Sequence, residues 1–91
     1  MKEKAVITVT GKDNVGIIAR VSTLCTQYKA NIVDITQSVL SEYFAMIMLV
    51  EINDLSIPFA DFADRLAAAG KEMALDIRAM HEDIFNTMHH I

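Results

Sequence analysis

The sequence predicts an α+β fold in which a four-stranded antiparallel sheet carries two helices on one face and a short helix follows at the C-terminal end. Segments with strand-like alternation and segments with the helical repeat follow one another in the order βαββαβ. The links between them are short, so neighbours in sequence are neighbours in space. The 91 residues allow one core, and we expect a single domain over 1–91, with the core at 4–80 and a tail at 81–91.

The first strand and first helix surround a polar turn. Residues 4–10 are mostly β-branched, with Val6 and Thr8 on one side and Ile7 and Val9 on the other. Asp13 and Asn14 in the turn suit the start of a helix, which we expect at about Val15. The expected buried stripe of this helix comprises Ile17, Ile18, Val21, Leu24, Cys25 and Tyr28.

A hairpin follows. The alternation at 32–40 predicts a half-buried strand with Ile32, Asp34, Thr36 and Ser38 on one side and Val33, Ile35, Gln37 and Val39 on the other. Ser41 and Glu42 form a tight connection. The segment 43–52 is apolar at nearly every position, so we expect a third strand that is buried on both sides.

Ser56 and Pro58 predict the start of the second helix. Its expected buried stripe is Phe59, Phe62, Ala63 and Leu66. Gly70 is expected to end it as a left-handed cap, and the fourth strand is expected at 73–80 with Leu75, Ile77 and Ala79 facing the core. The tail is expected to form a helix that covers the open sheet face or reaches a partner, with Ile84, Phe85, Met88 and Ile91 on one side. This order of elements is the ferredoxin-like arrangement.

Composition narrows the function classes. A hydrophobic fraction of 53% is high for a small domain and favours an oligomer interface. The net charge of -4 and the scattered basic residues argue against nucleic acid as a partner. Cys25 is the only cysteine, which excludes an internal disulfide and favours a reducing cytoplasm. No segment has the length and hydropathy of a signal peptide or a membrane span, so no membrane partner is expected.

Gly16 is the feature in the sequence with the clearest functional potential. A glycine costs stability near a helix start, and there it gives a ligand carboxylate access to the free N–H groups and the positive end of the helix dipole. The alternative is that Gly16 only permits close packing against the sheet or a neighbouring subunit. Spacing alone leaves both readings open.

The segment GKDNVGIIARVSTLCTQYKANIVDI and the hairpin after it resemble an ACT domain. In that family an Asp-x-x-Gly-(Ile/Val) turn enters the helix, matched here by Asp13, Gly16 and Ile17. Asn31 and Ile32 match the Asn-Ile that opens the second strand. The resemblance covers 4–80, and the ending HEDIFNTMHHI is similar to that of short stand-alone ACT proteins related to the bacterial glycine-cleavage regulatory protein.

The resemblance implies a regulatory module that forms a homodimer or higher homo-oligomer and holds an amino acid or similar metabolite at the subunit interface. The ligand-binding residues it implies are Asn14, Val15, Gly16, Ile17, Asn31 and Ile32. Backbone groups of 14–17 would take the ligand carboxylate, and the Asn31 amide would take its polar head. Asp13 would cap the helix. The family often has proline where this chain has Val15.

Three other readings stay beside this one. Acylphosphatases share this topology and also place a glycine and then an arginine after the first strand, as Gly16 and Arg20 are placed here. Their Gln-Gly-Val-x-Phe-Arg motif is absent from this sequence, so we expect no enzyme. His81, His89 and His90 have weak spacing for a metal, and we expect no metal and no cofactor. The main rival is a ligand-free adaptor that dimerises and docks on a protein partner.

Overall fold

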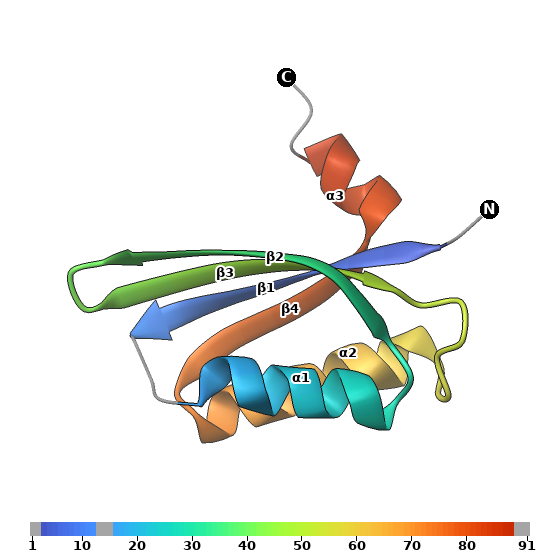
Figure 1. Ribbon diagram of the computed structural model, residues 1–91, viewed down its shortest axis with the longest axis horizontal. Helices are drawn as coiled ribbons and strands as arrows, with labels where there is room; N and C mark the ends of the chain where they lie inside the picture. The colour runs from blue at the N-terminus through green and yellow to red at the C-terminus, as the bar shows by residue number, and fades with distance from the viewer. Residues whose placement is uncertain (1–2, 13–15, 89–91) are drawn as a thin grey trace.

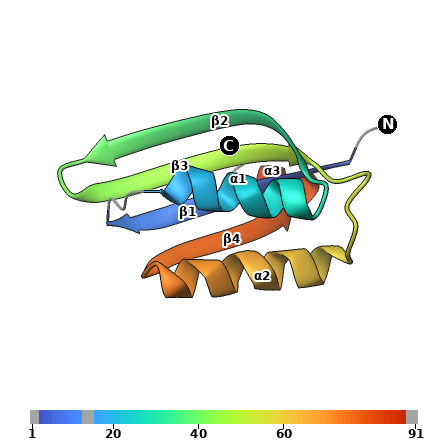
Figure 2. The same ribbon diagram turned by 60° about the horizontal axis from the view of Figure 1, so that its bottom comes forward.

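The computed structural model describes residues 3–12 and 16–88, and over these residues it confirms the expected order of elements (Figure 1). The elements are β1 (Lys4–Lys12), α1 (Ile17–Gln27), β2 (Asn31–Leu40), β3 (Tyr43–Glu51), α2 (Phe59–Glu72), β4 (Leu75–His81) and α3 (Glu82–Met88). The sheet has the order β2-β3-β1-β4 and every pairing is antiparallel, so β2 and β4 are its edges. Both α1 and α2 cover one face, while α3 lies on the other side (Figures 1 and 2).

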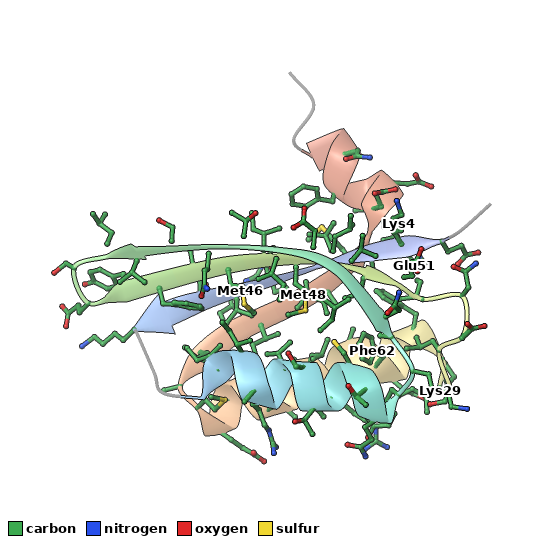
Figure 3. The ribbon with its side chains drawn as sticks, in the orientation of Figure 1. Lys4, Lys29, Met46, Met48, Glu51 and Phe62 are labelled. Atoms are coloured by element: carbon green, nitrogen blue, oxygen red, sulfur yellow. The ribbon has the colours of Figure 1, made fainter. Side chains whose placement is uncertain are left out.

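The core lies between the sheet and the two helices. Alternate residues of the central strands point inward and are buried: Ala5, Ile7 and Val9 from β1, with Phe44, Met46, Met48 and Val50 from β3. The helices supply Ile17, Val21, Cys25, Phe62 and Leu66. Figure 3 shows Met46 and Met48 above Phe62 in this layer. The two-residue alternation expected for β1 is confirmed, since Ile7 and Val9 face this core.

The expectation that β3 is buried on both sides is wrong. Its other face is open: Ala45 is exposed, Tyr43 is 57% exposed and Ile47 is 46% exposed. The tail helix α3 packs on β1 and β4. Because it is short, it leaves this face of β3 uncovered. At that end Val6, on the outer face of β1, is only 3% exposed. The outer face of the sheet is therefore covered at one end and open along the β2-β3 hairpin.

A bulge changes the faces of β2. The register shifts between Ile32 and Asp34, so Ile32 pairs with Val50 while Ile35 pairs with Met48. Both partners point into the core, which places Ile32 on the same face as Ile35 and corrects its expected grouping with Asp34. One extra residue in a strand reverses the alternation on one side of the insertion, and Val33 is that residue. Ile32 is half-buried against the core as a result.

Gly70 does not cap α2, which corrects the expected role of this residue. It lies inside the helix and is buried, and α2 continues to Glu72. A Cβ at Gly70 would stand 2.8 Å from the carbonyl oxygen of Leu75. The left-handed residue after the helix is Ala74, with a φ of 58°. Gly70 therefore allows α2 to approach β4 closely, and β4 begins at Leu75, two residues later than expected.

Ile18 lies on a flank of α1 instead of in its buried stripe. It is 37% exposed, whereas Ile17 and Val21 are buried as expected. Arg20 reaches across to Glu72 of α2, and two residues of helix correspond to a rotation of about 200°. Ile18 therefore faces away from α2, and Figure 2 shows β2 and α2 on opposite sides of α1. Val15, the expected first residue of the helix, lies outside the described residues.

The tail forms a helix as expected over Glu82–Met88. Ile84 is exposed and Phe85 is half-buried, while Ile91 lies outside the described residues. Within the part of the chain that the structure describes, no helix is long and apolar enough to cross a bilayer.

Candidate functional site

Gly16 occupies the N-cap of α1 in a left-handed conformation, with φ 88° and ψ 7°. Its carbonyl accepts the first helical hydrogen bond, from the N–H of Arg20 at 2.9 Å. Among the residues that the structure describes, no heavy atom outside Gly16 and its chain neighbours lies within 4 Å of the place where a Cβ would stand. The backbone angle, and not packing against the described part of the sheet, therefore favours glycine here.

Of the residues next to Gly16, the structure describes only those that follow it in the chain. Ile17 as a whole residue, its backbone included, is only 2% exposed, so it belongs to the core. Asn14 and Val15, which the family resemblance also implies as ligand contacts, lie outside the described residues. Asp13, the expected helix cap, lies outside them as well. Gly16 and Ile17 therefore represent this half of the predicted site.

Asn31 opens β2 and is exposed. Its Nδ2 donates a hydrogen bond of 2.9 Å to Oε1 of Glu51, which lies directly across the β2-β3 ladder. Ile32 pairs with Val50, and its half-buried side chain packs against the core. The contact between Asn31 and Glu51 was not anticipated from the sequence.

Asn31 and Glu51 line a polar depression of about 360 Å³ together with Lys29, Asn53 and Asp54. Asn53 is held in place, because its Oδ1 accepts a hydrogen bond of 3.0 Å from the backbone N–H of Glu3. Figure 3 shows Lys29 and Glu51 at this end of the sheet. The polar run Asn53-Asp54 after an apolar strand is the sequence signal that marks this depression.

The two halves of the predicted site are far apart within one chain. Gly16 precedes α1 and Asn31 follows its C-terminal end, and a helix of 11 residues spans about 16 Å. Figure 1 shows the start of α1 and the start of β2 at opposite ends of the helix layer. One chain therefore does not bring Gly16 and Asn31 to the same ligand.

A family model for the ACT domain matches residues 3–80. The chain belongs to the ACT domain family. It is 43% identical over 88 residues to a UPF0237 protein of Clostridium acetobutylicum, which covers 97% of this chain and 99% of that protein. It is 39% identical over 88 residues to a UPF0237 protein of Methanopyrus kandleri, covering 97% and 98% of the two chains.

Solved structures of similar fold also support the assignment to the ACT domain family. An ACT domain protein from Streptococcus pneumoniae superposes with a TM-score of 0.80 and 38% identity, over 93% of this chain and 96% of that one. A structure described as a putative glycine cleavage system transcriptional repressor gives a TM-score of 0.72 and 25% identity, over 89% of this chain and 46% of that one. This ACT domain is therefore a regulatory module with the ferredoxin-like fold.

Cys25 of the ACT domain is fully buried in the core on α1. Burial raises the pKa of its thiol from an ordinary value of 9.0 to about 11. A thiol with such a pKa is protonated at neutral pH, and the thiolate is the reactive form. Cys25 is therefore a core residue, in agreement with its place in the apolar stripe.

Arg20 and His81 have structural partners. The Nη2 of Arg20 lies 3.1 Å from Oε2 of Glu72, an exposed ion pair that links α1 to α2. The His81 ring stacks on Phe59, with 4.5 Å between ring centroids. Among the described residues no group of three or more His, Cys, Asp or Glu side chains is placed to hold a metal ion. His89 and His90 lie outside the described residues.

Proposed function

We propose that two chains of this ACT domain pair through their β2 edges and bind an amino acid, or a similar small carboxylate metabolite, between the Gly16 turn of one chain and Asn31 of the other. The separation of Gly16 from Asn31 along α1 is the observation that carries the proposal. A site that needs both residues needs two chains, and a two-fold pair supplies two equivalent sites.

The sheet topology supports this pairing. β2 is an edge strand that runs from Asn31 to Leu40. The turn before α1 leaves β1 after Lys12, which pairs with Tyr43 at the Leu40 end of the sheet. If two β2 strands pair antiparallel about a two-fold axis, Asn31 of the second chain lies at the end of the first chain where Gly16 is. The two halves of the site then meet across the interface.

Exposed apolar side chains along the same edge support an interface there. Val33 and Val39 of β2 are about half exposed, and Ile18, on the side of α1 away from α2, is 37% exposed. An unpaired edge strand with apolar neighbours is a surface that a second chain can cover by extending the sheet. The α1 flank would meet its symmetry mate beside the paired strands.

The Gly16 turn suits a carboxylate. The first N–H groups of a helix have no intrahelical partner, and the helix dipole makes this end positive. Gly16 has no Cβ, and no described atom beyond its chain neighbours lies within 4 Å of where one would stand, which favours the approach of a carboxylate to the free N–H groups. Because such a ligand contacts two chains, its binding stabilises the paired geometry, and this geometry is what a regulated protein would recognise.

Thermal unfolding in the presence of the twenty amino acids and common metabolites tests the proposal. A specific ligand raises the melting temperature by mass action. We expect a rise with at least one amino acid, glycine included in the panel, and loss of that rise in Gly16→Val and in Asn31→Ala. Thr23→Ala is the matched control, because Thr23 is exposed on α1 and its hydroxyl bonds only within the helix, to the carbonyl of Ala19. A rise that survives in both site variants would contradict the proposed site.

One observation favours a second function, the ligand-free adaptor. The outer face of the β2-β3 hairpin exposes Leu40, Tyr43 and Ile47 together. A contiguous apolar surface of this kind suits protein docking. A folded, dimeric protein that no compound in the panel stabilises would favour the adaptor over the sensor.

A further inference from the structure

We propose that the open outer face of the sheet is a second interface between copies of this chain, through which two copies stack sheet against sheet. The face is centred on Tyr43, Ala45 and Ile47 of β3, which are exposed and point away from the two helices that cover the core. The inference goes beyond the proposed function and does not rest on it, since this face and the β2 edge are different surfaces.

The outer face is apolar along β3 and uncharged on both sides of Ala45 and Ile47. The side chains directly opposite these two residues on β1 and β2 carry hydroxyl groups: Thr8, Thr10, Thr36 and Ser38. Residues opposite each other in a ladder point to the same side of the sheet. Ala45 is small and lies between the larger Tyr43 and Ile47, so side chains of a facing sheet can enter the gap. The face can therefore meet its own copy without bringing like charges together.

Two pairs of opposite charges border this face, and each pair lies within the chain. Arg78 on β4, opposite Thr8, lies 3.1 Å from Asp76 of the same strand. Lys12, opposite Tyr43, lies 3.8 Å from Glu42 in the hairpin turn. A foreign protein recognised by charge would have to compete with these pairs, whereas a second copy would not. The charge pattern thus favours a second copy as the occupant.

The helix α3 gives the outer face a step. It packs on β1 and β4 and rises on the side of the sheet opposite to α1 and α2 (Figure 1). A helix with its side chains is about 10 Å thick, and stacked sheets lie about 10 Å apart. The layer that α3 occupies is thus the layer that a second sheet would occupy over the open hairpin. Two copies related by a two-fold axis can fit these steps together, with α3 of each copy beside the stacked hairpins.

The size of the face indicates how strong the association is. The open part of β3, from Tyr43 to Leu49, spans about 23 Å and four strands span about 19 Å, so stacking covers a little over about 400 Å² of each chain. Two such faces bury roughly 900 Å² together, close to the lower limit of about 1,000 Å² for specific interfaces. We therefore expect a weak association that appears as the protein concentration rises.

Ile47→Lys is the decisive variant. It places a charge at the centre of the face, where a second copy would bring an identical charge close. Ile47 is already 46% exposed, so the fold should tolerate the change. Ala68→Lys adds the same charge at an exposed position of α2, across the sheet from this face, and is the matched control. The melting temperature of each variant checks that the fold is intact.

Sedimentation equilibrium over a range of concentrations supplies the first readout. We expect the native protein and Ala68→Lys to exceed the mass of a dimer at high concentration, and Ile47→Lys to weaken this step about tenfold or more. In Ile18→Arg, which disrupts the proposed edge contact, the face should still join two chains, and adding Ile47→Lys should weaken that step too. Failure of the edge pairing and failure of the face pairing are thereby distinguished.

Cross-linking reports contact at the face itself. Ala45→Cys places a thiol on the outer face, while the native Cys25 is buried and protonated and should not react. A short bismaleimide should join two Ala45→Cys chains, because stacked sheets lie about 10 Å apart. Ala68→Cys, with its thiol on α2, should be joined poorly.

Two results would overturn the proposal. One is that Ile47→Lys and Ala68→Lys show the same mass as each other and as the native protein at every concentration. The other is that Ala45→Cys is cross-linked no better than Ala68→Cys. Either result would leave the outer face to a protein of another kind, as in the adaptor function, and would not affect the shared site proposed between Gly16 and Asn31.

Discussion

Gly70 and Gly16 serve opposite purposes at the level of single residues. Gly70 is buried against β4, where a Cβ would stand 2.8 Å from the Leu75 carbonyl oxygen and 2.9 Å from Cγ1 of Ile77. At Gly16 the φ is positive, and no described atom beyond its chain neighbours lies within 4 Å of an added Cβ. The first position excludes a side chain by contact, and the second disfavours one through the backbone conformation.

Gly70→Ala should therefore destabilise the protein even though alanine is the better helix former. The clash costs about 1–3 kcal/mol, and the gain in helix propensity of about 1 kcal/mol offsets part of it. Denaturant unfolding should show a net loss of up to about 2 kcal/mol. Ala68→Gly, at an exposed position of the same helix, is the control and should lose about 1 kcal/mol from propensity alone. If Gly70→Ala stabilised the protein, β4 would be able to move away from the added Cβ at little cost, which would contradict the predicted clash.

The buried thiol of Cys25 should make the free energy of unfolding depend on pH. The pKa of its thiol is about 11 in the folded protein and 9.0 when exposed, so between these values the folded state holds more protons than the unfolded state. The free energy of unfolding therefore falls as pH rises from 9 to 11, while the contribution is complete below pH 9. Unfolding curves of the native protein and Cys25→Ala should approach each other over this window. A constant difference between them would contradict the raised pKa.

Helical and strand periodicity predicted the elements because each pattern depends on residues close in sequence. The register of β2 against β3 depends on a bulge that leaves no such pattern. The hairpin turn pairs Leu40 with Tyr43, and without a bulge this register would place Asn31 opposite Ile52. The inserted residue moves Asn31 to Glu51 instead. Glu51 could not be recognised as part of the site until that shift was known.

The open outer face of β3 was missed for a related reason. An apolar strand indicates that both faces avoid water, yet the sequence does not say which element covers them. The short tail helix lies on β1 and β4, which leaves Tyr43 and Ile47 exposed.

The ion pair between α1 and α2 predicts a small effect. Arg20 and Glu72 are both largely exposed, and exposed pairs contribute about 0–1 kcal/mol. Arg20→Ala should lower the free energy of unfolding by less than about 1 kcal/mol, and added salt should shrink the difference. Denaturant unfolding at low and high salt measures both. A larger loss of stability that does not depend on salt would mean that Arg20 stabilises the protein through packing of its aliphatic part and not through the ion pair with Glu72.

The whole molecule presents one helix flank and one sheet edge to a second chain in the proposed assembly. Ile18→Arg should weaken the dimer by about tenfold or more, since a charge would be buried at the α1 flank. Ala68→Arg adds the same charge at an exposed position on α2 and should leave association unchanged. Sedimentation equilibrium measures both dissociation constants. Equal behaviour of the two variants would place the interface elsewhere.

The candidate site could be predicted only in part from the sequence. Gly16 was found from its position at the expected helix start, and Asn31 through the family resemblance, which carries residue identities. Their separation along α1 is a property of the fold, as is the depression lined by Asn53 and Asp54. A site divided between chains leaves no pattern in either chain's local sequence.

Mixing Gly16→Val with Asn31→Ala tests the shared site most directly. Each homodimer has two damaged sites, but a mixed dimer has one intact site, built from Gly16 of one chain and Asn31 of the other. After chain exchange half of the dimers are mixed, so titration with the amino acid found in the panel should recover roughly a quarter of the native binding capacity. If the mixture binds no more ligand than the separate variants, Gly16 and Asn31 do not form one site across two chains.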